Sequence, residues 1–322
     1  MILEAGAPEY SMGSWDASVG MWGAPYIADP LSGLEVPAYM PGMDAVDMWG
    51  VRWIFEGNAP GAHPSHEPCD TVVTDIAKWR DQLSVPHDFS VGWSETEAFV
   101  EGIDRKERLV VSMLFPGILE RFVTLMGFEQ AMLALVDDPE EAGSLLDAIC
   151  DVKIAVFDET YKHVKPDMIE SHDDWGYKSA LTMSVEMWRE FIKPRTKRFY
   201  RHVLDKGVTI SHHSDCYAEP LAGDMIELGI SIWQGATPAN NIQAIKKQAN
   251  GKLTIMGGID STVVDAPRAA EEEIREEVRR AIREYAPGGF YIPCVTSEVA
   301  FNPGAQTIVD DEIRKADVRL WR

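Results

Sequence analysis

The sequence predicts a (β/α)8 TIM barrel with an irregular N-terminal extension that caps it. Strand-like apolar runs alternate with helix-like segments from about residue 108 onward, in six β-α units. Short turns that contain glycine join these units, which is typical of a parallel sheet. Polar side chains follow the strands, whereas the opposite turns are mostly glycine and proline, and barrel enzymes show this asymmetry. We therefore expect residues 1–100 to form the extension and cap, and residues 101–322 the barrel body of the same domain.

The N-terminal extension is rich in Gly, Pro, Trp and Met and has little regular periodicity. Residues 46–55 resemble a strand pair around Gly50, and residues 70–83 resemble a short helix. Because a closed barrel needs eight strands, we expect this region to supply the elements that six units lack. A loop-rich extension without a role in the site is the alternative interpretation.

The barrel body follows in order as strands and helices. Apolar runs predict strands at residues 109–115, 168–171, 208–213, 230–233, 253–256 and 290–294. Helices are predicted from near Phe128, from Pro139, after the N-cap Ser184, at 219–228, 242–248 and 269–285, and from Gln306 onward. No strand is followed by a dinucleotide or P-loop glycine motif, so these nucleotide-binding classes are disfavoured.

Composition limits the partners and the compartment. The chain has 322 residues, of which 45% are hydrophobic, so a sizeable core can be buried. Its net charge of −22 argues against nucleic acid and favours a partner with a basic docking face. The four cysteines are scattered, which indicates reduced thiols, and no secretory signal or membrane-length apolar run is present. We expect a cytoplasmic protein that does not contact a membrane.

The strand at 208–213 ends in a group of side chains that can bind metal. His212, His213, Asp215 and Cys216 lie within five residues, and Cys294 follows the last predicted strand. His213, Cys216 and Cys294 would form a zinc site with an open fourth position, and Asp215 is an alternative oxygen ligand. The opposing interpretation is that both cysteines are small buried residues.

A second polar group, His172, Asp173 and Asp174, follows the strand at 168–171. The aspartates are adjacent on extended backbone, so their side chains should point to opposite faces, with at most one in the barrel lumen. Catalysis as a general acid or base is one interpretation, and helix capping is the other. Asp260, in contrast, is better explained as the N-cap of the next helix.

Several side chains near the same strand ends are candidates to line a substrate pocket. They are the aromatic residues Trp175, Tyr177, Trp233 and Tyr291 and the amide Gln234. Such a set would suit a flat or aromatic substrate. Core packing is the alternative for each aromatic residue taken singly.

In combination, these motifs resemble the uroporphyrinogen decarboxylase superfamily over most of the chain from about residue 40. The motifs are Asp173-Asp-Trp-Gly176, then Ser184, Trp188, Phe191 and Pro194, then His213-Ser-Asp215, Glu227-Leu-Gly229 and Gly257-Gly-Ile-Asp260. The resemblance implies a (β/α)8 barrel with its site at the carboxyl ends of the strands.

Within the superfamily, the chain resembles the cobalamin-dependent methyltransferase branch. True decarboxylases resemble one another in an Arg-rich N-terminal segment, whereas the only arginine before Arg80 here is Arg52. Many of the methyltransferases carry a zinc site of the form H-x-C with a later Cys, and His213 and Cys294 match its ends. The middle position is Asp215 and the thiol is shifted to Cys216, so either residue is the implied ligand, or the site is altered or lost.

The resemblance implies methyl transfer from a small donor to the cobalt of a corrinoid protein that docks at the barrel rim. A ligand set with oxygen suits an oxygen substrate, so a methoxylated aromatic is the expected donor. Zinc, or an acid such as Asp173 or Asp174, would polarise its ether oxygen. Alternatives are a uroporphyrinogen-type decarboxylase and a non-catalytic corrinoid- or tetrapyrrole-binding protein. A homodimer is also compatible with the sequence.

Overall fold

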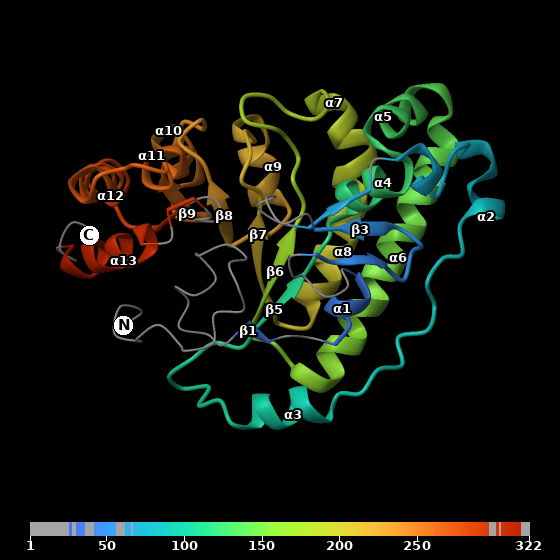
Figure 1. Ribbon diagram of the computed structural model, residues 1–322, viewed down its shortest axis with the longest axis horizontal. Helices are drawn as coiled ribbons and strands as arrows, with labels where there is room; N and C mark the ends of the chain where they lie inside the picture. The colour runs from blue at the N-terminus through green and yellow to red at the C-terminus, as the bar shows by residue number, and fades with distance from the viewer. Residues whose placement is uncertain are drawn as a thin grey trace.

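A sheet of seven parallel strands organises the computed structural model, which describes residues 26–27, 30–35, 42–55, 62–65, 67–295, 301–302 and 304–316 (Figure 1). The strands lie in the order β1 (Tyr26–Ile27), β5 (Val111–Leu114), β6 (Met168–His172), β7 (Thr209–His213), β8 (Ile232–Ala236), β9 (Thr254–Ile259) and β10 (Tyr291–Val295). From β5 to β10 each strand pairs with the next in sequence, and β1 adds a strand from the extension. The predicted (β/α)8 barrel is confirmed, with seven of its strands among the described residues.

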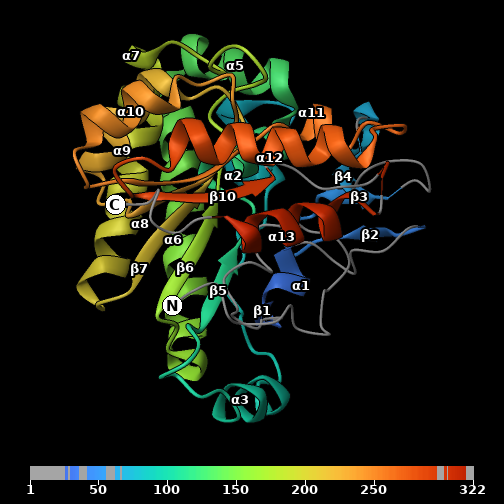
Figure 2. The same cartoon turned by 90° about the vertical axis from the view of Figure 1, so that its left-hand side faces the viewer.

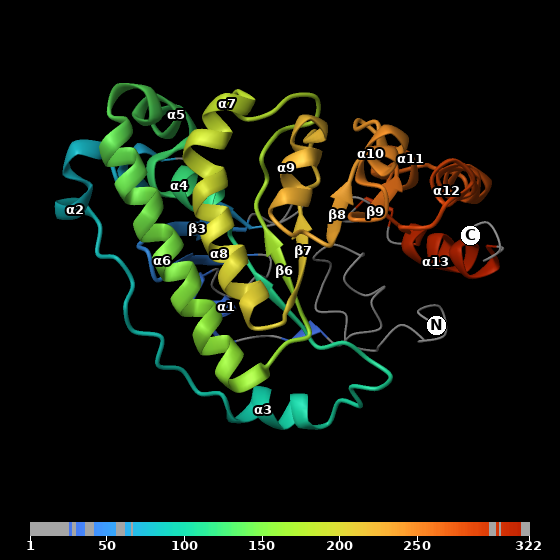
Figure 3. The ribbon, with the colours of Figure 1, turned by 180° about the vertical axis from the view of Figure 1, so that it is seen from behind.

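Helices join the strands and cover the outer face of the sheet. Figure 3 shows α6, α8 and α9 in front of the strands, and Figure 2 shows α12 and α13 side by side next to β10. The helices are α4 (Ile118–Met126), α5 (Phe128–Asp137), α6 (Pro139–Val164), α7 (Val185–Met187), a π-helical turn at Trp188–Ile192, α8 (Lys193–Asp205), a 3₁₀ turn at Glu219–Leu221, α9 (Ala222–Glu227), α10 (Ile242–Ala249), α11 (Ser261–Val264), α12 (Glu271–Tyr285) and α13 (Ala305–Lys315).

Side-chain caps fix where several helices begin. The Ser184 hydroxyl accepts a hydrogen bond from the backbone N–H of Met187 at the start of α7, as predicted. The carboxylate of Asp138 accepts from the N–H of Glu141, directly before the proline that opens α6. Asp260 caps α11, which agrees with the structural role expected for it.

Alternation along the strands separates the barrel interior from the helix-covered face. Val111, Met168, Met256 and Cys294 pack as a small buried cluster of their own, apart from the main core. Ile169 and Ile255, which are adjacent to Met168 and Met256 in sequence, belong to the main core between sheet and helices. Because side chains alternate along a strand, residues an even number of positions from this cluster face the barrel interior.

The extension contributes a second, antiparallel sheet of β2 (Asp44–Val46), β3 (Arg52–Ile54) and β4 (His63–Pro64). The predicted strand pair is therefore confirmed, with Gly50 at positive φ in its turn. The predicted helix at 70–83 is present only as 3₁₀ turns at Pro68–Asp70 and Ile76–Lys78 and the four-residue α2 (Trp79–Gln82).

Two further contacts tie the extension to the barrel. Arg121 of α4 forms buried ion pairs with Glu35, which ends α1 (Ser32–Glu35), and with Asp47. Trp93, directly before α3 (Ser94–Glu101), stacks on His163 near the end of α6 with ring centroids 4.6 Å apart. Figure 1 shows α3 at the end of the molecule opposite α5 and α7. The first 25 residues, which the sequence assigns to the cap, lie outside the described residues.

Among the described helices, none has the length and apolar composition to cross a membrane.

Candidate functional site

Two histidines and an aspartate converge at the carboxyl ends of β6 and β7. Ligand atoms of His172, Asp174 and His213 all lie within 4.8 Å of one another. His172 and His213 are register partners on the neighbouring strands, and their rings stack with centroids 4.1 Å apart. Both residues lie an even number of positions from barrel-interior residues, so the pair closes the carboxyl end of the interior.

Glu120 of α4 holds the ring of His172. Its carboxylate lies 2.9 Å from Nδ1 of His172 and accepts hydrogen bonds from the N–H groups of Gly117 (2.8 Å) and Asp174 (3.2 Å). Burial acts to raise the pKa of Glu120, but His172 and these N–H groups outweigh it and lower the pKa to about 2. Phe115 packs edge-on against the same ring. The imidazole is thus fixed both by packing and by a carboxylate on Nδ1.

Gln234 of β8 orients the ring of His213 in the same way. The strands place these residues in register, and Nδ1 of His213 is hydrogen-bonded to Oε1 of Gln234. The preceding His212 points to the other face of the sheet, where its Nδ1 lies 2.7 Å from the hydroxyl of Tyr200 and its ring stacks on Trp175. Burial lowers the pKa of His212 well below its usual value.

Asp173 and Asp174 point in opposite directions, as extended backbone requires. The carboxylate of Asp173 accepts from the N–H groups of Leu119 (3.3 Å) and Glu120 (3.1 Å), so it caps α4. Burial, and then the charge of Glu120, raises its pKa to about 7. A Cβ on Gly117 would lie 2.2 Å from Asp173, so only glycine permits this close approach. The capping interpretation therefore describes Asp173.

Asp174 is the aspartate that faces the site. Its Oδ1 accepts from the hydroxyl of Ser214 (3.2 Å) and the N–H of Asp215 (3.1 Å). Burial, and then the charge of Asp215, raises its pKa to about 6, while His172 opposes the shift.

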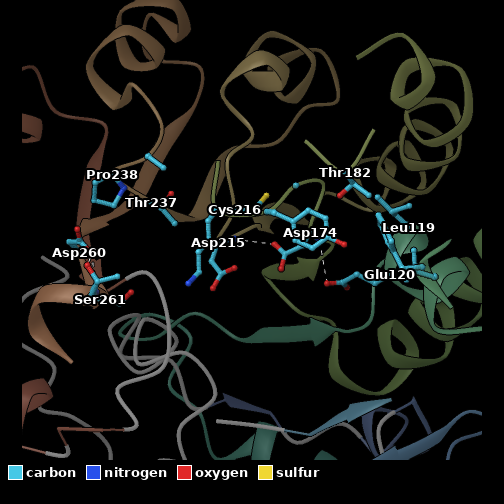
Figure 4. A pocket seen from close by; sticks show the side chains of 17 residues that line it. Leu119, Glu120, Asp174, Thr182, Asp215, Cys216, Thr237, Pro238, Asp260 and Ser261 are labelled. Atoms are coloured by element: carbon cyan, nitrogen blue, oxygen red, sulfur yellow. Dashed lines mark hydrogen bonds between the residues drawn. The ribbon is translucent and has the colours of Figure 1, made fainter. Parts of the chain in front are cut away.

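Asp174 also lines a pocket of about 620 Å³ at the carboxyl ends of the strands (Figure 4). Four carboxylates line it, those of Glu120, Asp174, Asp215 and Asp260, and Lys178 is the one cation among its described lining residues. The remaining wall includes Leu119, Val123, Phe128, Tyr177 and Pro238. The pocket thus combines apolar side chains with four acidic ones in its lining.

The predicted metal ligands are not brought together as one set. In the described part of the chain, no three of His213, Asp215, Cys216 and Cys294 have ligand atoms within 4.8 Å of one another. Cys216 lines the pocket, but its Sγ lies 3.0 Å from the hydroxyl of Ser214, and burial, then Asp174, raises its pKa to about 12. Cys294 packs in the barrel interior. Of the predicted set, His213 alone joins a compact group.

The predicted pocket aromatics also divide. Tyr177 lines the pocket and makes an edge contact with Phe128. Trp175, Trp233 and Tyr291 belong to the buried core between sheet and helices, outside the pocket lining. Core packing, the alternative considered for them, describes these three. Trp233 and Tyr291 lie at strand positions that face the helices, and Trp175, beyond the end of β6, stacks on His212. Gln234 positions His213 from within the barrel.

Glu120, the partner of His172, is a residue of the candidate site that the sequence did not indicate. It lies three residues after Gly117, at the N-terminus of the helix that follows β5. In the sequence, Glu120 is recognisable as an acidic residue shortly after a strand, at position N3 of the following helix. These features indicate a helix cap as readily as a partner for His172.

Comparisons with known proteins give a family and a fold. The family model described as Uroporphyrinogen decarboxylase (URO-D) matches residues 106–309. A methyltransferase from Methanosarcina mazei has a similar structure, with a TM-score of 0.57 and 16% sequence identity over 78% of this chain and 72% of that chain. At that identity the likeness concerns the fold. No curated protein matches in sequence.

Proposed function

The chain belongs to the uroporphyrinogen decarboxylase family, and we propose that it is a methyltransferase that moves a methyl group from a small donor to a corrinoid protein. The donor we propose is a methoxylated aromatic, which loses its O-methyl group. The observation that carries this choice is the charge of the pocket, which four carboxylates and one lysine line. One of these carboxylates, Asp174, also belongs to the His–Asp–His group.

That charge disfavours the decarboxylase alternative. A porphyrinogen with many carboxylates needs several cations around it, because buried or clustered anions must be paired. Lys178 supplies one positive charge among the described lining residues, against four acidic side chains. An uncharged donor avoids this repulsion.

The pocket offers both parts of a methoxyarene a suitable environment. Tyr177 and Phe128 present aromatic surface at the pocket, where a flat ring can pack. Asp174 lines the pocket and belongs to the His–Asp–His group, so it would be the member of that group nearest to a bound ether oxygen. When bound, a metal supplies a Lewis acid for the ether oxygen, and the corrinoid supplies the acceptor for the methyl group. The chain's own residues bind the ring and orient the ether oxygen.

A corrinoid-protein partner is supported by the surface beside the pocket. Phe128, Leu133 and Val136 on α5 are exposed, at 43%, 45% and 66%. Phe128, the first residue of α5, also lines the pocket, so this exposed helix begins at the pocket. Apolar surface of this kind is typical of protein contact sites. We propose that the corrinoid protein docks over α5 and the pocket mouth.

The test is incubation of the purified chain with reduced cobalamin and a panel of methoxylated aromatics, methylamines, methanol and thiols. Appearance of the demethylated phenol, quantified by chromatography, is the expected result. Asp174→Asn should lower the rate by about 100-fold or more, as expected for loss of an acid or a metal-binding carboxylate at the reacting centre. Asp88→Asn, an exposed position, is the matched control. Release of CO2 from a porphyrinogen, or cobalamin binding without turnover of any donor, would contradict the proposal.

A further inference from the structure

We propose that His172, Asp174 and His213 bind one divalent transition-metal ion, preferably zinc, at the carboxyl ends of β6 and β7. This set replaces the thiolate-containing set that the sequence suggests, and it retains His213 alone. Only the role of this metal in methyl transfer rests on the proposed function; metal binding itself does not.

The donor types and their spacing fit such an ion. Two imidazoles and a carboxylate are a common ligand set of catalytic zinc, which keeps its fourth position open. The three ligand atoms lie within 4.8 Å of one another, which leaves space for an ion between them. Register pairing of β6 with β7 fixes two of the three ligands on rigid strands, so little ordering is needed on binding.

Both histidines are oriented through the same ring nitrogen, Nδ1. Nδ1 of His172 faces the carboxylate of Glu120, and Nδ1 of His213 faces the amide oxygen of Gln234. An acceptor at Nδ1 favours the tautomer that carries its proton there, in which Nε2 is the nitrogen that can ligate a metal. Metal-bound histidines almost always donate their other N–H in this way. Glu120 and Gln234 are therefore positioning residues for the metal.

The carboxylate of Asp174 is oriented in a similar way. Its Oδ1 accepts from the hydroxyl of Ser214 and the N–H of Asp215. Oδ2 is then the oxygen available to the ion. Because Asp174 also lines the pocket, the open coordination position would face the substrate. A metal here would meet the oxygen of a bound methyl donor.

The two cysteines are separated from this group. The thiol of Cys216 is hydrogen-bonded to Ser214, and Cys294 packs among apolar side chains of the barrel interior. Neither sulfur belongs to a compact group of ligand atoms in the described residues. The proposed metal site therefore has only nitrogen and oxygen ligands, from the two histidines and Asp174.

Cobalt(II) binding distinguishes the two ligand sets directly. The chain is stripped with a chelator and titrated with cobalt(II) in the absence of donor and corrinoid, so that failure here is separate from failure of methyl transfer. We expect one equivalent to bind, with visible d–d absorption and without the near-ultraviolet sulfur-to-cobalt charge-transfer band. Cys216→Ser and Cys294→Ala should leave the spectrum and the affinity unchanged.

Substitutions then assign the ligands. Gln234→Leu should weaken cobalt binding by about 10- to 100-fold, as expected for loss of an outer-shell partner. His213→Ala should weaken it further, and His87→Ala, an exposed position, should leave it unchanged. Circular dichroism checks that each variant is folded, and the wild-type spectrum decides the question if one is not. A charge-transfer band that disappears in either cysteine variant, or no cobalt bound by the wild type, would overturn the proposal.

Discussion

Arg121 offers the sharpest test of how the extension is joined to the helix that supports the site. Its guanidinium is 2% exposed and pairs with Glu35 at 2.6 Å and with Asp47. The side chains of Glu35 and Asp47 are 7% and 0% exposed, so neither carboxylate has much access to water. Arg121→Met would keep much of the volume and remove the charge. Two buried carboxylates would then lack their cation.

The expected cost follows from that burial. Removing one partner of a buried ion pair costs about 3–5 kcal/mol, because an uncompensated charge remains inside the protein. Asp47 would still accept hydrogen bonds from the N–H groups of Trp49 and Val51, both 2.9 Å long. These bonds would partly stabilise its negative charge in the absence of Arg121. We therefore expect the free energy of unfolding to fall by an amount within this range.

The assay is equilibrium urea unfolding followed by tryptophan fluorescence and circular dichroism. Arg189→Met is the matched control, because Arg189 is 52% exposed and its partner Asp224 keeps a 2.6 Å contact with Lys193. Its loss should cost about 0–1 kcal/mol. Adding Glu35→Gln to the Arg121 variant should restore part of the stability. Equal costs for the two arginine variants would refute the reasoning.

Three further predictions concern packing, thiol reactivity and specificity. Gly117→Ala should destabilise the protein by about 1–3 kcal/mol in thermal or urea unfolding, because its Cβ would lie 2.2 Å from Asp173, whereas Gly304→Ala meets no atom within 4 Å and should be neutral. At pH 8 and under native conditions, iodoacetamide should modify the exposed Cys69 and spare Cys216, whose pKa is raised to about 12 by burial; peptide mass spectrometry reads this out. Methoxyarenes that bear a carboxylate should show a higher KM than neutral ones of the same shape, because of the acidic pocket.

Each of these has a contradicting outcome. Equal stability of the two glycine variants would mean that the contact between helix and aspartate relaxes without cost. Labelling of the buried thiol at the rate of the exposed one would show that the segment after β7 opens freely. A preference for carboxylate-bearing donors would place the substrate outside the acidic pocket.

The fold could be predicted from the sequence because the local patterns of strands, turns and helix caps agree with the overall order of a parallel barrel. Apolar runs bounded by glycine turns marked all six strands of the barrel body, and N-cap residues marked helix starts. The ends of β8 and β9 were the exceptions, since the strands were expected to stop at Gly235 and Gly257, whereas both continue through these glycines. A Cβ on Gly257 would lie 2.4 Å from the carbonyl oxygen of Ala236, so glycine here serves close approach of two strands.

The site was only partly readable. The position of His172 and His213 at strand ends follows from local sequence, and their convergence follows from strand order. The direction of each side chain depends on register, so Trp233 and Tyr291 could not be assigned to the helix-facing side beforehand. The contact between Glu120 and His172 joins residues 52 apart and depends on how α4 docks. No local pattern carries that information.

On the proposed function, this acidic pocket demethylates a neutral methoxyarene with a corrinoid as acceptor. The most direct measurement is single-turnover chromatography of a methoxyarene mixed with the purified, metal-loaded chain and reduced cobalamin. We expect one equivalent of phenol per cobalamin and none in its absence. Phenol formation that does not depend on the chain, or decarboxylation of a porphyrinogen in its place, would contradict the account.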